Sequence, residues 1–365
     1  MKKILHITSG DVYGGAESQL VSLMAGFSHQ RSDYSHVVLL FNKGELSQKL
    51  EKLGVHTIIL SELDLSFVGL VRKVRHSVSS LSPDVVHVHN YKESVLAMLC
   101  LPGTHFKLVR TLHGWPEIQW SIKRLFNIVV RLVDITTTRF ITDKVVLVSP
   151  QMVKRAHQLY GKSKCVVVEN GIEIEGEAGV RNEATKGPVR VGFVGRLVSV
   201  KRLDLFLQIA NKLSADNRFQ FKIYGDGPLS YEIDEARLVN VSYYGKRPTS
   251  QIYPEIDVLL ICSDSEGLPM VLLEALANRV IVLARQVGGI PYVVQNRKNG
   301  FLVDSEEPNA YIHLLREIAL DPTGGKELKE NGYKTIATDY SMETCAAQYS
   351  KLYNNLYLKS GSGND

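Results

Sequence analysis

The chain has 365 residues, of which 44% are hydrophobic and 22% charged, with a net charge of +5, a composition typical of a folded protein with one or two domains. Its four cysteines lie far apart and form no C-x-x-C pair, which excludes a disulfide framework and a zinc finger and favours a reducing compartment. No run approaches the about 18 apolar residues of a spanning helix, and the first apolar run, which turns polar at Thr8, is too short for a signal peptide. We therefore expect a cytoplasmic protein.

Short β-branched apolar runs alternate along the chain with longer amphipathic segments, a pattern that predicts parallel sheets with crossover helices. In the first half we expect strands at 3–8, 36–41, 56–60, 84–89, 107–113 and 144–149. In the second half we expect them at 189–195, 219–225, 241–245, 258–263 and 280–284.

A Gly- and Glu-rich stretch without apolar periodicity, residues 171–188, separates the two halves and ends in Gly-Pro, the marks of a linker. The fold class is therefore α/β, with two doubly wound parallel-sheet domains at 1–178 and 179–341. Such sheets bind ligands beyond the carboxyl ends of their strands, so the informative residues should follow each strand.

The first strand is followed by Gly14 and Gly15, directly before a helix start. Glycines at a helix N-terminus allow a phosphate or sugar to approach, although a plain structural turn explains them about as well. The segment is not G-x-G-x-x-G, which counts against a nicotinamide cofactor and an oxidoreductase.

Histidines mark the next strand ends. His87 and His89 lie on one side of a strand, because side chains alternate, but no third metal ligand is evident and a hydrogen-bonding role is favoured for His89. His113 ends the following strand, where it could bind a hydroxyl or relay a proton, or simply be a satisfied polar residue.

In the second half, Arg196 and Lys201 follow a strand that ends in Gly195 and precede a helix expected near Lys201. Two cations there could hold a diphosphate, Arg through its fork and Lys as a point charge; solvated surface cations are the alternative. Gly225 opens a Gly-Asp-Gly-Pro loop, in which Asp226 could be only a turn residue.

The stretch DSEGLPMVLLEAL, residues 264–276, predicts a polar loop and a helix with Pro269 in its first turn. The free amides of the helix start suit an anion, Glu266 can accept bonds from sugar hydroxyls, and Glu274 can chelate a ribose diol. An acid that complements the helix dipole explains Glu266 in part. It explains Glu274 poorly, because apolar residues surround it.

Taken together, these motifs resemble the retaining glycosyltransferases of family GT4, which have the GT-B fold and an E-x7-E motif. The resemblance spans almost the whole chain. It rests on the following segments: GGAE (14–17), HG at 113, ENGI (169–172), GRL…K (195–201), YGDGPL (224–229), EGLPMVLLE (266–274), VGGIP (287–291) and NGFLV (299–303).

The resemblance implies an inter-domain cleft and a set of roles. Arg196 and Lys201 would bind the donor diphosphate, Glu274 the ribose, and Glu266 with Gly267, Leu268, Pro269 and Met270 the transferred sugar. His113 would lie near the reacting sugar, Gly14 and Gly15 on the acceptor or phosphate side, and the base between Gly225 and Gly245. The C-terminal segment 342–365 would cross back onto the first domain.

The chain departs from the family where Arg279 and Ile281 replace a common Gly and Pro. Helix ends prefer Gly for its left-handed conformation, so the end of this helix is in question.

The implied activity is transfer of a hexosyl group from a nucleotide sugar, expected to be a UDP-sugar, with retention, to a hydroxyl of a glycan or lipid-linked glycan in cell-surface polysaccharide or glycolipid biosynthesis. We expect no metal, no other cofactor and no nucleic acid partner. Asp264 and Glu266 imitate a metal-binding D-x-D that the family does not use. A GT-B epimerase or phosphorylase and a non-catalytic nucleotide-sugar-binding module are the alternatives.

The positive charge is concentrated between residues 105 and 155, where nine basic residues face three acidic ones. Both tryptophans, Trp115 and Trp120, lie there, and apolar residues recur at helical spacing between cations. The segment 115–135 therefore fits an interfacial helix on anionic lipid at the cytoplasmic face of the inner membrane, or an ordinary amphipathic helix packed on its own sheet.

Overall fold

The computed structural model describes residues 2–10, 13–30, 34–89, 91–100, 105–115, 124–174, 187–320 and 324–358. It divides into two compact units, Met1–Glu173 with Met342–Asp365, and Ile174–Ser341. The domain boundary predicted between residues 178 and 179 lies outside the described residues. Over the described part of the chain, every helix is too short or too polar to cross a membrane.

The first unit is built on a parallel sheet of seven strands in the order β3-β2-β1-β4-β5-β6-β7. The strands are β1 (Lys2–Thr8), β2 (Tyr34–Leu40), β3 (His56–Ile59), β4 (Val85–Val88), β5 (Lys107–Leu112), β6 (Lys144–Leu147) and β7 (Cys165–Val167). The last strand was not predicted, because it is only three residues long and none of its residues is fully buried.

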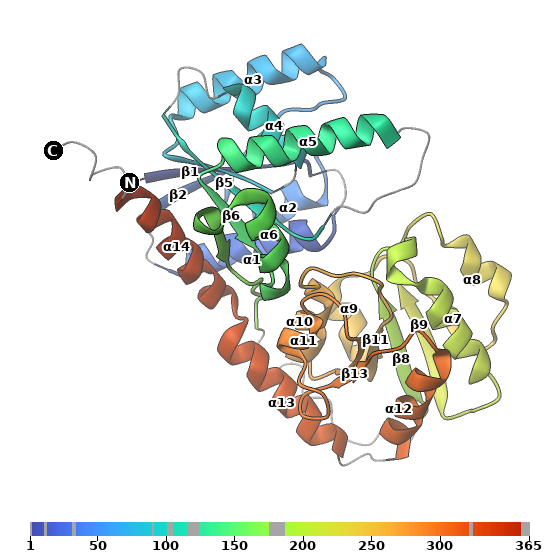
Figure 1. Cartoon of the computed structure of the whole chain (residues 1–365). Coiled ribbons are helices and arrows are strands. Elements are labelled where there is room, and N and C mark those ends of the chain that lie inside the picture. Colours follow the sequence, from blue (N-terminus) through green and yellow to red (C-terminus); the bar gives the residue numbers. More distant parts are fainter. Residues whose placement is uncertain are drawn as a thin grey trace. The chain divides into compact units, whose positions relative to one another are not determined.

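Helices cover both faces of this sheet (Figure 1). They are α1 (Gly15–His29), α2 (Glu45–Lys52), α3 (Phe67–Leu81), α4 (Tyr91–Cys100), α5 (Arg124–Phe140), α6 (Val153–Tyr160) and α14 (Met342–Leu358). Leu23 of α1, Leu50 of α2 and Tyr353 of α14 belong to the apolar cluster on one face. Leu70 of α3 and Leu96 of α4 belong to the cluster on the other.

The second unit has a parallel sheet of six strands in the order β10-β9-β8-β11-β12-β13. The strands are β8 (Val189–Val194), β9 (Phe219–Tyr224), β10 (Val241–Tyr243), β11 (Val258–Ile261), β12 (Ile281–Arg285) and β13 (Phe301–Val303). The prediction of two doubly wound parallel sheets is thus confirmed, with β13 as a second short strand that the sequence reading missed. How the two units face each other stays a prediction.

The helices of the second unit are α7 (Leu203–Lys212), α8 (Tyr231–Ala236), α9 (Thr249–Ile252), α10 (Met270–Ala277), α11 (Ile290–Val293), α12 (Pro308–Leu320) and α13 (Gly324–Asp339). Short 3-10 turns occur at Pro150–Met152, Lys162–Lys164, Ser199–Lys201 and Tyr253–Glu255. Leu203 and Phe206 of α7 share one apolar cluster with Tyr311 of α12, while α10 packs on α13.

The C-terminal helix α14 packs on α1, in the first unit. The contact is close because Gly26 lies against the backbone of Met342, where a β-carbon would collide with the Met342 carbonyl oxygen. The Met342 amide also donates to the Ile172 carbonyl at 2.8 Å. The start of α14 is therefore held at both sides by residues of the first unit.

The helix that ends just before Arg279, where the sequence departs from the family, has a regular end. α10 ends at Ala277, and Arg279 takes the left-handed conformation with φ 55°, which a glycine would adopt at lower cost. The Arg279 side chain donates to Glu330 at 3.0 Å and lies 3.7 Å from the Tyr333 ring centroid. Both contacts join the end of α10 to α13.

Candidate functional site

In the second unit, the loops that follow β8 and β9 interlock through glycines. Gly195 and Gly225 have φ of 153° and 130°, and a β-carbon on Gly225 would collide with the Gly195 carbonyl oxygen. The Gly195 amide donates to Tyr224 at 3.0 Å, and the Leu197 amide donates to Asp226 at 2.9 Å. Asp226, for which the sequence suggested a turn residue, thus also connects the two loops through its backbone.

The loops after β11 and β12 are joined in the same way. Gly288 has φ 61°, and a β-carbon there would collide with the Glu266 carbonyl oxygen. The Gly289 amide donates to the Gly267 carbonyl at 2.6 Å. The backbone of Glu266 is therefore positioned by close contact with the next loop, which only glycine permits.

Two predicted site residues, Lys201 and Glu266, form an ion pair with 2.6 Å between Nζ and Oε1. The side chains are only 21% and 8% exposed, so the pair is shielded from solvent more than an ordinary surface pair. The sequence reading named both residues but did not predict that they touch. The pair fixes a positive and a negative group side by side at the carboxyl end of the sheet.

Arg196 lies in the same loop as Lys201 and is exposed. Among the described residues, its guanidinium takes part in neither an ion pair nor a side-chain hydrogen bond. A guanidinium in this condition keeps all its donors for an anion.

Glu274 lies in the second turn of α10, where its carboxylate accepts a hydrogen bond from Tyr253 at 2.7 Å. Burial, and then the neighbouring Glu274 charge, raise the pKa of Tyr253 well above its usual value, so the hydroxyl stays protonated and donates. Sequence reasoning missed Tyr253, since nothing in its local pattern marks it. The carboxylate is therefore oriented, which suits the recognition of a diol.

The start of α10 differs slightly from the prediction. Pro269 is the residue before the helix rather than part of its first turn, and it carries no side-chain cap bond. Leu268 and Met270 on either side are buried, each 4% exposed. Their apolar side chains hold the loop in the core, so what this segment can offer a ligand is backbone.

The predicted base-side residues, Gly225 and Gly245, are neighbours. The Gly225 amide donates to the Gly245 carbonyl at 2.9 Å, and the Tyr243 hydroxyl donates to the Gly225 carbonyl at 3.2 Å. The Tyr224 and Tyr244 rings stack beside them with centroids 5.0 Å apart and planes at 13°.

Asp264 is engaged by cations of the protein itself. It pairs with Arg202, at 3.0 Å, and with Arg285, and both arginines also pair with Glu306. Arg202, in the left-handed conformation, ends the 3-10 turn and precedes α7. The resemblance of residues 264–266 to a metal-binding D-x-D is thus explained by two separate ion-pair networks, one for each acid.

In the first unit, Gly14 precedes α1 and Gly15 is its first residue. The Gly14 amide donates to the Glu17 carboxylate at 3.1 Å. Glu17 therefore occupies part of the hydrogen-bonding capacity of this helix start, which agrees with the structural-turn alternative as well as with a ligand site.

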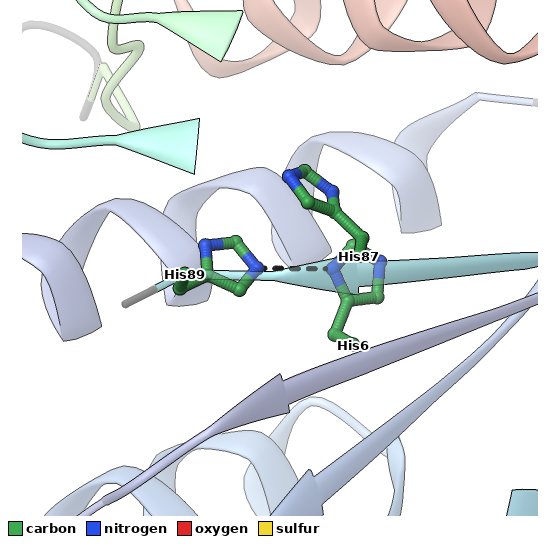
Figure 2. Close-up of side chains that lie close together, drawn as sticks. All are labelled: His6, His87 and His89. Carbon is green, nitrogen blue, oxygen red and sulfur yellow. Dashed lines mark hydrogen bonds between the residues drawn. The ribbon is translucent and has the colours of Figure 1, made fainter. Parts of the chain in front are cut away.

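Histidines from three strands gather at the centre of the first unit, and Figure 2 shows His6, His87 and His89. His6 Nδ1 is 3.2 Å from His89 Nε2, and His6 Nε2 is 3.2 Å from His36 Nδ1. His87 is hydrogen-bonded on both sides, to Tyr353 and to Thr111 at 2.7 Å. Burial lowers the pKa of His87 to about 3 and that of His36 to about 4, so the rings are neutral at pH 7.

The third histidine, His6, was missed when the sequence suggested that His87 and His89 lack a further metal ligand. Ligand atoms of the three lie within 4.8 Å of one another. Because both ring nitrogens of His6 and of His87 already have partners, the cluster is built as a hydrogen-bond network of neutral rings. These contacts agree with the hydrogen-bonding role predicted at this strand end.

His113 lies next to this network, its ring centroid 5.8 Å from that of His89. Burial lowers the pKa of His113 to about 4. Its Nε2 and the Nδ1 of His89 are buried and have no hydrogen-bond partner among the described residues. Imidazole nitrogens in this condition, at the ends of neighbouring strands, can bind a neutral hydroxyl.

Residues 116–123 of the segment 115–135, Trp120 among them, lie outside the described residues. Trp115 packs under Arg155, with 4.5 Å from the guanidinium carbon to the ring centroid. In the described part of α5, Leu132 is 57% exposed. The interfacial-helix hypothesis for this segment stays a prediction.

Comparison with known proteins matches both units to family models. Residues 13–175 match the model described as Glycosyltransferase Family 4, and residues 177–335 match the model described as Glycosyl transferases group 1. The two matches adjoin at the linker and together include every predicted site residue.

Individual relatives of the chain are also named as glycosyltransferases. An uncharacterized glycosyltransferase from Methanocaldococcus jannaschii is 26% identical, over 77% of this chain and 78% of its own. The O-antigen biosynthesis glycosyltransferase WbnH from Escherichia coli is 26% identical, over 84% of this chain and 87% of its own.

The crystal structure of Anabaena HepE in complex with UDP-glucose has a TM-score of 0.82 at 19% identity, covering 97% of this chain and 100% of that one. At this identity the likeness shows the fold, which is the predicted GT-B fold. From both family matches and the two parallel-sheet units, we conclude that the chain belongs to the family 4, group 1 glycosyltransferases.

Proposed function

We propose that the protein is a retaining hexosyltransferase that uses a UDP-sugar. The acceptor is a hydroxyl of a glycan or lipid-linked glycan, in the biosynthesis of a cell-surface polysaccharide or glycolipid. The observation that carries the proposal is the Lys201–Glu266 ion pair at the carboxyl end of the second sheet. The exposed Arg196 of the same loop forms no ion pair within the described part of the chain. The UDP-glucose bound to HepE and the O-antigen role in the name of WbnH support the choice of donor and pathway.

In this proposal Arg196 and Lys201 bind the donor diphosphate, Glu266 accepts bonds from hydroxyls of the sugar, and Glu274 binds the ribose. The loop glycines Gly225 and Gly245, with the adjacent tyrosines, border the base. His113 donates or accepts at a hydroxyl of the reacting sugar as a neutral imidazole. Gly14 and Gly15 border the acceptor or phosphate side.

The proposed reaction is a front-face displacement. The bond from the anomeric carbon to the phosphate oxygen breaks with its electron pair going to the diphosphate. The acceptor oxygen bonds to the same face, and its proton passes to the departing phosphate oxygen. Glu266 is a poor candidate for a covalent nucleophile, because in this assignment its carboxylate faces sugar hydroxyls remote from the anomeric carbon. The cations stabilise charge that develops on the leaving group.

The test has two steps. Thermal-shift measurements with UDP-, GDP- and ADP-sugars identify the donor, and we expect UDP-sugars to raise the melting temperature most. Lys201→Ala and Glu266→Ala should each lower turnover on the order of 100-fold or more while the protein stays folded. Lys212→Ala, which removes an exposed cation of the same unit, is the matched control. Normal turnover in either site variant would refute the assignment, and NMR of the product reports the anomeric configuration.

A further inference from the structure

A row of histidine rings crosses the sheet of the first unit. His36 of β2, His6 of β1 and His89 at the end of β4 lie on neighbouring strands, and His113 follows the next strand, β5. His6 Nε2 is 3.2 Å from His36 Nδ1, and His6 Nδ1 is 3.2 Å from His89 Nε2 (Figure 2). Two ring-to-ring contacts therefore connect the middle of the sheet with its carboxyl end.

Each of these contacts needs a proton on one of its two nitrogens. Burial lowers the pKa of His6 and His89 well below the usual value and that of His36 to about 4, so at pH 7 each ring carries one proton. His6 takes part in both contacts, so one of its nitrogens donates and the other accepts. Both hydrogen bonds must then run in the same direction along the row, and the three tautomers are coupled.

Two arrangements satisfy both contacts. In the first, every ring carries its proton on Nε2, so that His89 donates to His6 and His6 donates to His36. In the second, every ring carries it on Nδ1 and both bonds are reversed. The ends do not decide between them, because His36 Nε2 and His89 Nδ1 have no partner among the described residues in either case. The neutral histidine side chain intrinsically prefers the proton on Nε2, which favours the first arrangement in all three rings.

We propose that this row commits His89 to offering Nδ1 as a hydrogen-bond acceptor, beside His113, to a hydroxyl of the reacting sugar, with His6 and His36 as positioning residues. The ring centroids of His89 and His113 are 5.8 Å apart. The His113 nitrogen that has no partner within the described part of the chain is Nε2, which is a donor in the same preferred tautomer. One hydroxyl can accept from His113 and donate to His89. The role at the hydroxyl rests on the proposed function, whereas the tautomers do not.

The direction of the row selects the chemical class of the group that is bound. An ionised carboxylate or phosphate oxygen offers only lone pairs and would meet the lone pair of His89 Nδ1 at a buried place, where an unsatisfied contact is costly. A neutral hydroxyl satisfies both nitrogens at once. This part of the first unit should therefore accept a sugar hydroxyl and reject an anionic group.

A row of imidazoles could instead carry a proton away from the site. The far end of this row, His36 Nε2, is buried and has no partner in the part of the chain that the structure describes. A proton that arrived there would leave a charged ring where burial disfavours charge. The contacts thus fit a fixed direction of hydrogen bonding better than proton transport.

The direct test is ¹⁵N NMR of the full chain labelled with ¹⁵N-histidine at pH 7, without substrate. Protonated and unprotonated ring nitrogens have different chemical shifts, and single histidine substitutions assign the signals. We expect His6, His36 and His89 all to carry the proton on Nε2. A proton on His89 Nδ1 in the wild type would overturn the proposal.

Two variants of His6 separate the bond from packing. His6→Phe removes the acceptor for His89 and should allow a detectable fraction of His89 to carry its proton on Nδ1. His6→Asn keeps an oxygen acceptor near the place of Nδ1 and should restore the single tautomer. His56→Phe, at an exposed histidine of the same unit, is the matched control. Unchanged tautomers of His89 in His6→Phe would show that the row does not set them.

Turnover tests the role at the hydroxyl, with the UDP-sugar that thermal-shift measurements select. His6→Phe should lower turnover about two- to ten-fold, as expected for one misdirected hydrogen bond, and His6→Asn should recover most of it. Equal turnover of the two variants would refute the positioning role. A wild type that turns over no UDP-sugar would contradict the proposed function and the hydroxyl role together, but not the tautomers found by NMR.

Discussion

At the scale of single residues, the site depends on charged side chains that are paired before any ligand arrives. Lys201 neutralises Glu266, and Tyr253 donates to Glu274. A pre-positioned carboxylate loses less side-chain entropy on binding than a free one. The partner of each acid is therefore part of its function.

The Tyr253–Glu274 bond predicts a graded effect on nucleotide binding. Tyr253→Phe removes the orienting bond and keeps the carboxylate, so UDP should bind about two- to ten-fold more weakly. Glu274→Ala removes the proposed ribose ligand and should weaken UDP binding by more than about ten-fold. Isothermal titration calorimetry with UDP measures both.

Tyr231→Phe is the control for these two variants, because it removes the same hydroxyl group from a tyrosine that is 52% exposed on α8. If Glu274→Ala binds UDP as tightly as the wild type, the ribose assignment is wrong.

At the scale of elements, the loops of the second unit are assembled by close backbone contacts. Gly225 lies against the backbone of Gly195, and Gly288 lies against that of Glu266. Such contacts fix the loops after four different strands with respect to one another. The position of the candidate site therefore depends on close backbone contacts that only glycine permits.

Two glycines with nearly equal φ separate backbone strain from steric contact. Gly288 has φ 61° and Gly245 has φ 64°, but a β-carbon on Gly245 would meet no atom within 4 Å. Gly245→Ala should cost only the left-handed strain of about 1 kcal/mol. Gly288→Ala should cost about 1–3 kcal/mol more, because the loop must move.

Differential scanning calorimetry compares the unfolding temperatures of the two variants. Hydrogen exchange of peptides that contain residues 264–268 shows whether this loop loses protection. Equal unfolding temperatures for the two variants would show that the Gly288 contact does not matter.

At the scale of the whole molecule, the buried histidines make the stability of the first unit depend on pH. Folded-state pKa values of about 4 for His36 and His113 and about 3 for His87 lie below the about 6.5 of unfolded histidine. Between these values the unfolded chain binds more protons than the folded one. Stability is therefore complete above about pH 6.5 and is lost as the pH falls toward 4.

As the pH falls through this window, each such histidine should reduce the free energy of unfolding by up to about 1.4 kcal/mol per pH unit. Hydrogen exchange corrected for intrinsic rate should show loss of protection between pH 7 and pH 5 in the first unit. The second unit contains a single histidine, the exposed His313, and should change little.

His36→Gln should flatten the pH dependence by about 2 kcal/mol between pH 7 and pH 5, whereas His313→Gln should leave it unchanged. An equal slope in the two variants would contradict the assignment to the buried network.

Much of the fold could be predicted from the sequence, because strands buried on both faces appear as continuous apolar runs that need no knowledge of their neighbours. The exceptions are β7 and β13, which have three residues each. The candidate site residues after the strands were predicted in the same way, since parallel sheets bind ligands beyond the carboxyl ends of their strands.

The sequence by itself determined the alternation of strands and helices, the family and the residues that stand at the strand ends. Only the tertiary structure decided which side chains are in contact. His6 meets His87 because β1 and β4 are neighbours in register, and Lys201 meets Glu266 because β8 and β11 are. Parallel neighbours are joined through long crossovers, so these contacts leave no local trace in the order of the residues.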